Sequence, residues 1–159
     1  MFAPDPRIAI CPGTFDPVPH GHLDVISRAS AMYDAVVVGV VNVPWRKGGT
    51  VFNIDERIGF IENATRDLAN TTVEPFSTLL VEFARLKGAM AIVKGLRAIS
   101  DFEYELEMNQ LNHRQAPEIE SVYLMASDKY SFLSSSGVKE LATFGGNIDE
   151  LVPREVADA

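Results

Sequence analysis

An apolar run near the start of the chain leads into a turn that carries residues suited to phosphate chemistry. After residues 7–11 come Pro12-Gly13-Thr14-Phe15-Asp16-Pro17-Val18-Pro19-His20-Gly21-His22. The prolines and glycines predict a tight turn, and a helix is expected to begin near His22. The first turn of a helix presents unpaired N–H groups and attracts phosphate. His22 would add a side-chain donor, Gly21 would let a ligand approach the backbone, and Thr14 would offer a hydroxyl and an amide.

A plainer interpretation of His22 is a capping residue in a proline-rich loop. Metal binding by His20 and His22 is disfavoured, because two residues apart suits a strand better than the start of a helix. No Cys or third His follows with the spacing of a ligand. We therefore expect no metal site built from histidine.

Positively charged side chains gather after two further apolar runs. Lys94 and Arg97 flank a glycine and a leucine after residues 90–93, and Arg46 and Lys47 follow the second run. Charges at strand ends are usually only solvated. An acidic chain that binds an anion must nevertheless place its few cations locally. Because both pairs are expected at the same edge of a sheet, they predict an anion-binding site.

A carboxylate stands apart from its neighbours in the segment Asp101-Phe102-Glu103-Tyr104-Glu105-Leu106-Glu107. Glu103 and Glu107 share one helix face, which is most simply solvated. Glu105 lies on nearly the opposite side. Contact with a sugar or base, support of Arg97, and pairing with a surface cation all remain open for it.

Four serines within six residues, Ser131, Ser134, Ser135 and Ser136, precede an apolar helical stretch. A single serine there is usually a helix cap. Four exceed what one cap requires, and clustered hydroxyl and N–H donors suit a triphosphate.

The elements that must position these side chains alternate along the chain. Strands are predicted at residues 7–11, 35–41, 71–76, 90–93 and 121–125. Helices are predicted from near residue 22 to 33, from 53 to 68, from Ser77 to a closing Gly88, and over 99–113 and 136–144.

This order predicts an α/β fold: a single-domain, Rossmann-like, five-stranded parallel sheet over residues 1–159, with helices on both faces. Ligands of such sheets bind beyond the carboxyl ends of the strands, which is where the candidate residues fall. The tail from Asp149 to Ala159 is expected to be no more than a frayed helix.

Composition excludes several classes of function. The chain has 159 residues, enough for one domain, and a formal net charge of −8. Acidity without a basic stretch argues against a general nucleic-acid binder. Cys11 is the only cysteine, so a disulfide scaffold is excluded. No signal peptide is recognised, and the longest apolar run, 35–41, is far shorter than the ~20 residues of a membrane span. A cytoplasmic protein without a membrane partner is expected.

Taken together, four segments resemble the bacterial phosphopantetheine adenylyltransferases, over about residues 8–153. They are the Pro-Gly-Thr-Phe-Asp-Pro turn ending in Gly21-His22, the loop Lys94-Gly95-Leu96-Arg97, the segment Asp101–Glu105 and the serines 134–136. The Gly-His pair alone would indicate only the nucleotidyltransferase superfamily, whereas the combination with GLR and DFEYE is much more specific.

The resemblance implies transfer of AMP from ATP to 4′-phosphopantetheine, giving dephospho-coenzyme A and pyrophosphate with help from Mg²⁺. It also implies the penultimate step of coenzyme A synthesis, a homohexamer, and coenzyme A as a candidate feedback ligand. The residues implied to bind ATP are Thr14, Phe15, His22, Gly95, Leu96, Arg97, Glu105, Tyr130, Ser131, Phe132, Leu133, Ser134, Ser135 and Ser136. The residues implied to contact the acceptor are Thr14, Lys47, Leu80 and Lys94.

Two features depart from the family pattern. Where the family has Thr or His three residues before the final His, this chain has Pro19, followed by His20. A side-chain contact from that position to the nucleotide phosphate is therefore missing or supplied by His20. The stretch 44–52 is about two residues longer than usual, so Arg46 and Lys47 compete for the family's lysine role, and we assign it to Lys47.

The reaction explains the residue types. The acceptor phosphate is already anionic, so the protein must orient it and neutralise charge rather than supply a base. We expect His22 and Lys47 to stabilise charge, Thr14 to position the acceptor, and Arg97 with the serines to hold the departing phosphates. The alternatives are a nucleotidyltransferase with another acceptor, such as nicotinate mononucleotide, and a nucleotide-binding regulatory module without turnover. Length and acidity exclude an aminoacyl-tRNA synthetase.

Overall fold

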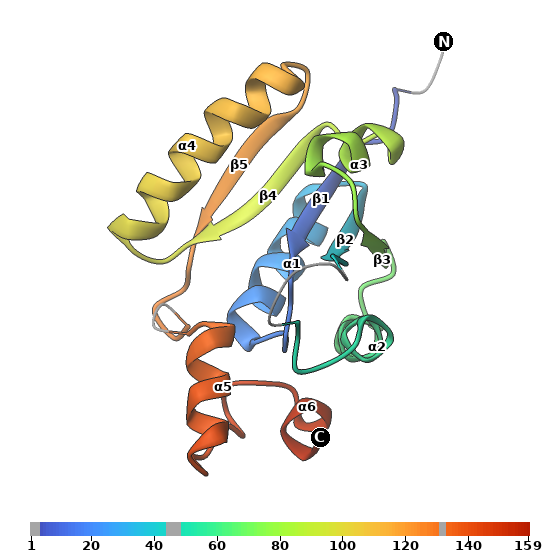
Figure 1. Ribbon diagram of the computed structural model, residues 1–159. Coiled ribbons are helices and arrows are strands. Elements are labelled where there is room, and N and C mark those ends of the chain that lie inside the picture. Colours follow the sequence, from blue (N-terminus) through green and yellow to red (C-terminus); the bar gives the residue numbers. More distant parts are fainter. Residues whose placement is uncertain (1–3, 44–48, 131–132) are drawn as a thin grey trace.

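The computed structural model describes residues 4–43, 49–130 and 133–159, with the side chains of 99 and 100 left aside. Strands and helices alternate along it (Figure 1). The strands are β1 (Ile8–Gly13), β2 (Ala35–Val41), β3 (Thr71–Phe76), β4 (Ala91–Leu96) and β5 (Glu120–Met125). The helices are α1 (His20–Met32), α2 (Ile54–Ala64), α3 (Leu80–Leu86), α4 (Ile99–Gln115), α5 (Ser135–Thr143) and α6 (Arg154–Asp158).

The five strands form one parallel sheet in the order β3-β2-β1-β4-β5. The chain therefore reverses direction across the sheet between β3 and β4, next to the central β1. All carboxyl ends lie at one edge, and Figure 1 shows α5 and α6 beyond that edge. This confirms the predicted Rossmann-like fold and puts its switch point at β1, where such sheets bind ligands.

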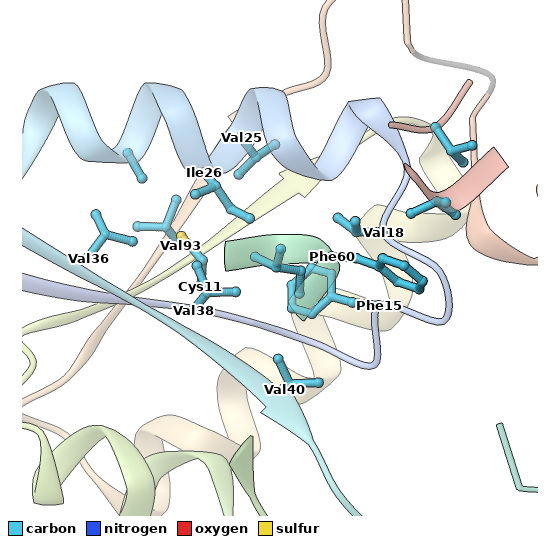
Figure 2. Close-up of a cluster of buried hydrophobic side chains, with 14 of the residues drawn as sticks. Cys11, Phe15, Val18, Val25, Ile26, Val36, Val38, Val40, Phe60 and Val93 are labelled. Atoms are coloured by element: carbon cyan, nitrogen blue, oxygen red, sulfur yellow. The ribbon is translucent and has the colours of Figure 1, made fainter. Parts of the chain in front are cut away.

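Apolar side chains cover both faces of the sheet. Ala9 and Cys11 of β1 lie in one buried cluster with Val25 and Ile26 of α1, and Figure 2 shows the contact between α1 and the strands. Ile10, next along β1, lies in the second cluster with residues of α3. Because successive side chains of a strand point to opposite faces, apolar residues at consecutive positions are what a doubly covered strand requires.

The capping signals in the sequence predict the ends of the helices only in part. Asn53 accepts from the Glu56 N–H at 2.8 Å and the Glu56 carboxylate reaches back to the Asn53 N–H, so α2 begins with the predicted capping box. Helix α2 ends at Ala64 rather than residue 68. Gly88, with φ of +69°, follows α3 as predicted.

Several boundaries were predicted wrongly. Helix α3 begins at Leu80 rather than Ser77, and no side chain caps it. Helix α1 begins at His20 rather than near His22, because Pro19 is already extended and its carbonyl accepts from the first turn. Strand β4 continues through Leu96, so Lys94 and Gly95 lie inside a strand and not in the loop after it.

The carboxyl-terminal tail is part of the core, which overturns the prediction of a frayed end. Val152 and Val156 are 1% and 3% exposed and lie in the same cluster as α1 and β2. The Leu151 carbonyl also accepts from the His20 N–H at 2.9 Å. The tail therefore helps to fix the start of α1, on which His22 stands.

Burial of α1 predicts a large loss of stability when Ile26 is shortened. Ile26 is 1% exposed, and an Ile-to-Ala change in a packed core costs about 2–5 kcal/mol. We expect Ile26→Ala to lower the free energy of unfolding, measured by urea denaturation, by an amount in that range. Met32→Ala in the same helix, at a residue that is 41% exposed, is the control and should change it far less. Equal losses would contradict the packing described.

Candidate active site

Two adjoining cavities open at the carboxyl edge of the sheet, with volumes of about 700 and 490 Å³. Phe15, His22 and Arg97 line both. The larger cavity also contains Thr14, Asp16, Arg57, Ser134–Ser136 and Lys139 on its walls, and the smaller contains Lys94, Gly95, Tyr104 and Glu105. The structure therefore brings His22, Lys94 and Arg97 to one shared space, as the sequence analysis predicted.

His22 stands in the first turn of α1, at the junction of the two cavities. Its ring meets the edge of Phe15, with centroids 5.3 Å apart and planes at 90°. His22 is exposed where its ring faces the cavities, yet protein atoms surround the rest of the ring closely. This burial, together with the positive charge of Arg97, lowers the pKa of His22 to about 4. The imidazole is therefore neutral at pH 7 and has one N–H to donate.

The backbone around His22 offers less to a phosphate than the sequence predicted. The His20 N–H donates to Leu151, and the His22 N–H donates to the Pro19 carbonyl at 3.1 Å. A side chain on Gly21 would face Tyr130 rather than a cavity. The first turn of α1 therefore contributes the side chain of His22 to the site, rather than its backbone N–H groups. His20 lies beside Tyr130 and lines neither cavity, so it is not placed to provide the phosphate contact that a proline at position 19 cannot make.

Arg97 ties the end of β4 to the segment before α5. Its Nε and Nη2 donate to the Asp101 carboxylate at 3.1 and 3.3 Å, and its Nη1 donates to the Leu133 carbonyl at 2.7 Å. Asp101, not Glu105, therefore supports Arg97. These bonds hold the guanidinium at the shared wall of both cavities, where an anion would meet its charge.

Glu105 pairs with a cation, Lys94, and does not support Arg97. Its carboxylate accepts from the Lys94 ammonium at 2.9 Å, and Tyr123 donates its hydroxyl to the Glu105 carbonyl at 3.2 Å. Both charged groups line the smaller cavity. Gly95 lies next to Lys94 in β4, and a Cβ there would come within 2.8 Å of Val25, so only glycine fits this approach of β4 to α1.

Two of the three described serines make structural hydrogen bonds, and all three line the larger cavity. Ser134 caps α5 by accepting from the Gly137 N–H at 3.1 Å, and Ser135 donates to the Pro17 carbonyl at 2.8 Å. Ser136 is exposed on the cavity wall. All three line the larger cavity together with the amino end of α5, whose first-turn N–H groups have no partners inside the helix.

Two functional residues were missed by the sequence analysis. Arg57 is 3% exposed, and its guanidinium donates to the carbonyls of Phe52, Thr14 and Val41 at 3.1, 2.9 and 2.9 Å. The sequence does carry a signal that Arg57 is buried: it lies in the apolar stripe of α2, three residues after Ile54 and four before Ile61.

Asp16 is the second missed residue. Its carboxylate is 3% exposed and accepts from the Val51 and Phe52 N–H groups at 2.8 and 2.9 Å, and it lies 3.3 Å from the Lys139 ammonium. Asp16 and Arg57 together fasten residues 51–52 to the loop after β1. That loop carries Thr14, which stands exposed on the wall of the larger cavity.

Other predicted site residues lie elsewhere. Leu80 packs against the core cluster on the α3 face and lines neither cavity, so it is not placed to contact an acceptor there. Tyr130 packs near His20, Leu133 is buried in the core, and Leu96 ends β4 outside the two linings. Lys47, the competing Arg46, and Ser131 and Phe132 lie outside the described residues.

Two further properties bear on the chemistry of the site. Within the described ranges, no group of three His, Cys, Asp or Glu side chains could hold a metal ion. Burial raises the pKa of the Cys11 thiol, at the smaller cavity, to about 12, so it stays protonated at pH 7.

Over the part of the chain that the structure describes, each helix is too short or too polar to cross a membrane.

The environment of His22 predicts an unusual titration. In the free protein, NMR of the imidazole Cε1–H should show a midpoint far below the ordinary 6.5, because burial and Arg97 disfavour the imidazolium. ATP should raise the midpoint, since phosphate favours the charged ring, and binding should therefore take up protons between the two pKa values. The His22→Gln variant assigns the signal. A midpoint at or above 6.5 without ligand would contradict the described environment.

Comparison with known proteins agrees with this geometry. Residues 10–141 match the cytidylyltransferase-like family. The phosphopantetheine adenylyltransferase of Moorella thermoacetica is 50% identical over 94% of this chain and 92% of its own, and that of Alkaliphilus oremlandii is 52% identical over 96% of both. The crystal structure of a putative nicotinate-nucleotide adenylyltransferase from Vibrio parahaemolyticus shares the fold, with a TM-score of 0.67 at 15% identity over 96% of this chain and 90% of that one. This chain belongs to the phosphopantetheine adenylyltransferase family of nucleotidyltransferases.

Proposed function

We propose that the two joined cavities transfer AMP from ATP to 4′-phosphopantetheine, with dephospho-coenzyme A and pyrophosphate as products. The observation that supports this most is that His22 and Arg97 line both cavities. A transfer between two bound substrates needs one place where the acceptor phosphate and the α-phosphate of ATP meet. All of this chemistry is assigned to one nucleotidyltransferase domain over residues 1–159.

The acceptor needs no general base, because a phosphate monoester is already an anion near neutral pH. Its oxygen attacks the α-phosphorus in line, the bond to the bridging oxygen breaks, and pyrophosphate leaves with that electron pair. The protein contributes orientation and fixed donors for the charge spread over the phosphoryl oxygens. The neutral His22 imidazole is suited to this role, since it donates without a change in its own protonation.

The remaining roles follow the cavity walls. Lys94 in the smaller cavity is assigned to the acceptor phosphate, and Thr14 to its positioning. Arg97, with the serines and the amino end of α5, is assigned to the departing phosphates. Lys47 remains proposed as a second charge-stabilising residue.

Magnesium enters this proposal with ATP rather than as a resident ion. Both oxygens of Asp16, the carboxylate of the larger cavity, already accept backbone N–H groups, and the described side chains provide no cage for a metal. Mg²⁺ commonly keeps several waters and binds through substrate phosphates. The ion would then neutralise charge on the phosphate chain.

We place the reaction in the cytoplasm, as the penultimate step of coenzyme A synthesis. Coenzyme A is dephospho-coenzyme A with one more phosphate, so it would share most contacts with the product. It is therefore retained as a candidate feedback ligand of the same cavities.

We propose a homohexamer, and the exposed apolar surface of α4 supports contact between copies of the chain. Phe102, Tyr104, Leu106 and Leu111 of this helix, and Met125 at the end of β5, are between 46% and 71% exposed. Figure 1 shows α4 and β5 along one side of the molecule. Exposed apolar side chains gathered on adjacent elements are typical of a surface that another chain covers.

If copies of the chain meet through α4, a charge there should separate them. We expect Leu106→Glu and Leu111→Glu together to lower the mass measured by light scattering from that of a hexamer to that of smaller species. Leu86→Glu, at an exposed leucine on α3, is the control and should leave the mass unchanged. A monomeric parent protein, or a double variant with the parent's mass, would contradict this interface.

Activity is tested by release of pyrophosphate from ATP with each acceptor. Release should require 4′-phosphopantetheine and should be far slower with nicotinate mononucleotide or with no acceptor.

In His22→Ala, kcat should fall about 10²–10³-fold, the usual effect of losing one transition-state donor, with a smaller change in ATP affinity. His20→Ala, two residues earlier in the chain and outside both cavities, should stay near the parent's activity. Tight ATP binding without turnover would instead favour a regulatory module, and an unchanged kcat in His22→Ala would remove His22 from the transition state.

A further inference from the structure

Lys94 and Glu105 form an ion pair on the wall of the smaller cavity. The Lys94 ammonium, on β4, donates to the Glu105 carboxylate of α4 at 2.9 Å, and the two side chains are 22% and 17% exposed. The Tyr123 hydroxyl, on the neighbouring β5, lies 3.5 Å from the same carboxylate oxygen. Both charged groups line the smaller cavity, and neither lines the larger one. The positive charge assigned to the acceptor phosphate is therefore already matched by a negative charge before that phosphate binds.

The described side chains that line the smaller cavity carry no net formal charge. Lys94 and Arg97 are positive, Asp101 and Glu105 are negative, and each cation contacts one of the carboxylates. A site for a phosphate usually gains affinity from an excess of positive charge. Here the acceptor side of the joined cavities offers charged hydrogen-bond donors without such an excess.

The larger cavity is different, because its described lining has an excess of positive charge. Arg57, Arg97 and Lys139 line it, and Asp16 is the one carboxylate among its described residues. The protein thus presents a balanced ion pair to the acceptor and net positive charge to the phosphates of the nucleotide.

The proposed reaction moves negative charge in the same direction. A phosphate monoester carries about 1.5–2 negative charges at pH 7, and in the product the same phosphate carries about one, because its attacking oxygen has become a bridge. The electron pair of the broken bond leaves with pyrophosphate. An unmatched cation beside the acceptor phosphate would stabilise the bound substrate more than the transition state, and it would therefore slow the chemical step.

We propose that Glu105 is a positioning residue that holds Lys94 and offsets its charge, so that hydrogen bonds orient the acceptor phosphate without binding it too tightly. An ammonium has three N–H groups, and the bond to Glu105 uses one of those of Lys94. The inference rests on the proposed function, since it takes 4′-phosphopantetheine as the ligand of the smaller cavity. It differs from the contact with ATP that the family resemblance implies for Glu105.

Glu105→Gln separates charge from position, because it removes the charge and keeps an oxygen that can accept from Lys94. Calorimetry on the full chain compares 4′-phosphopantetheine, pantetheine without the phosphate, and ATP. We expect 4′-phosphopantetheine to bind about three- to tenfold more tightly, since a nearby carboxylate no longer opposes its charge. Pantetheine, which has no phosphate, and ATP, whose phosphates are assigned to the larger cavity, should each change less than about twofold.

The same variant should turn over more slowly with both substrates saturating. We expect kcat for pyrophosphate release to fall about threefold or more while KM for the acceptor also falls, because the added binding is made mainly in the ground state. A merely structural role would instead raise KM or lower the thermal unfolding midpoint. Glu105→Asp keeps the charge and should restore most of the parent's kcat and affinity.

Glu103→Gln is the matched control, because it makes the same change in net charge at an exposed residue of α4 that lines neither cavity. It should bind and turn over like the parent. Parent-like or weaker binding of 4′-phosphopantetheine in Glu105→Gln, an equal gain for pantetheine, a loss of ATP affinity, an unchanged kcat, or the same changes in Glu103→Gln would each overturn the inference. A parent protein that releases no pyrophosphate with 4′-phosphopantetheine would instead overturn the proposed function, and this inference with it.

Discussion

The buried guanidinium of Arg57 holds the carboxyl edge of the sheet together. A charged group removed from water destabilises a protein unless its hydrogen bonds are satisfied. Arg57 meets this condition by donating to the end of β2, to the loop after β1 and to the residue before the cap of α2. Burial lowers the pKa of Arg57, while the nearby Asp16 opposes that effect, and an arginine remains charged at pH 7 in any case. Three chain segments far apart in sequence are thereby fixed around one cavity.

That scaffold explains how an acidic chain can collect phosphates. The net charge is −8, yet His22, Arg97, Lys139 and Lys94 face two joined cavities at a single edge. Parallel strands bring their carboxyl ends to the same edge, where Lys94 lies within β4, Arg97 follows that strand, and His22 and Lys139 stand in helices α1 and α5. The carboxylates nearby are engaged: Asp101 holds Arg97, Asp16 holds Lys139, and Glu105 holds Lys94. Within the described residues, no buried side-chain N or O lacks a partner, so the buried polar groups are satisfied without a ligand.

The sequence predicted the sheet well because doubly covered strands must be apolar at consecutive positions, as Val36 to Val38 are. It also predicted that His22, Lys94 and Arg97 share a cavity, since topology alone brings strand ends together. It failed where the outcome depends on tertiary contacts. Spacing on a helix left the partner of Glu105 open, and the helix expected from Ser77 begins instead at Leu80, without a side-chain cap. Arg57 was missed because a charge within an apolar stripe is understood only when the carbonyls around it are known.

The central claim is that two substrates meet where the cavities join, beside His22 and Arg97. A crystal structure of the protein with dephospho-coenzyme A tests it most directly, because that molecule contains the bond the reaction forms. We expect its diphosphate within hydrogen-bonding distance of the His22 imidazole, with the pantetheine arm and the adenosine extending away from that point into the joined cavities. A product bound away from His22, or with its diphosphate outside both cavities, would contradict the account.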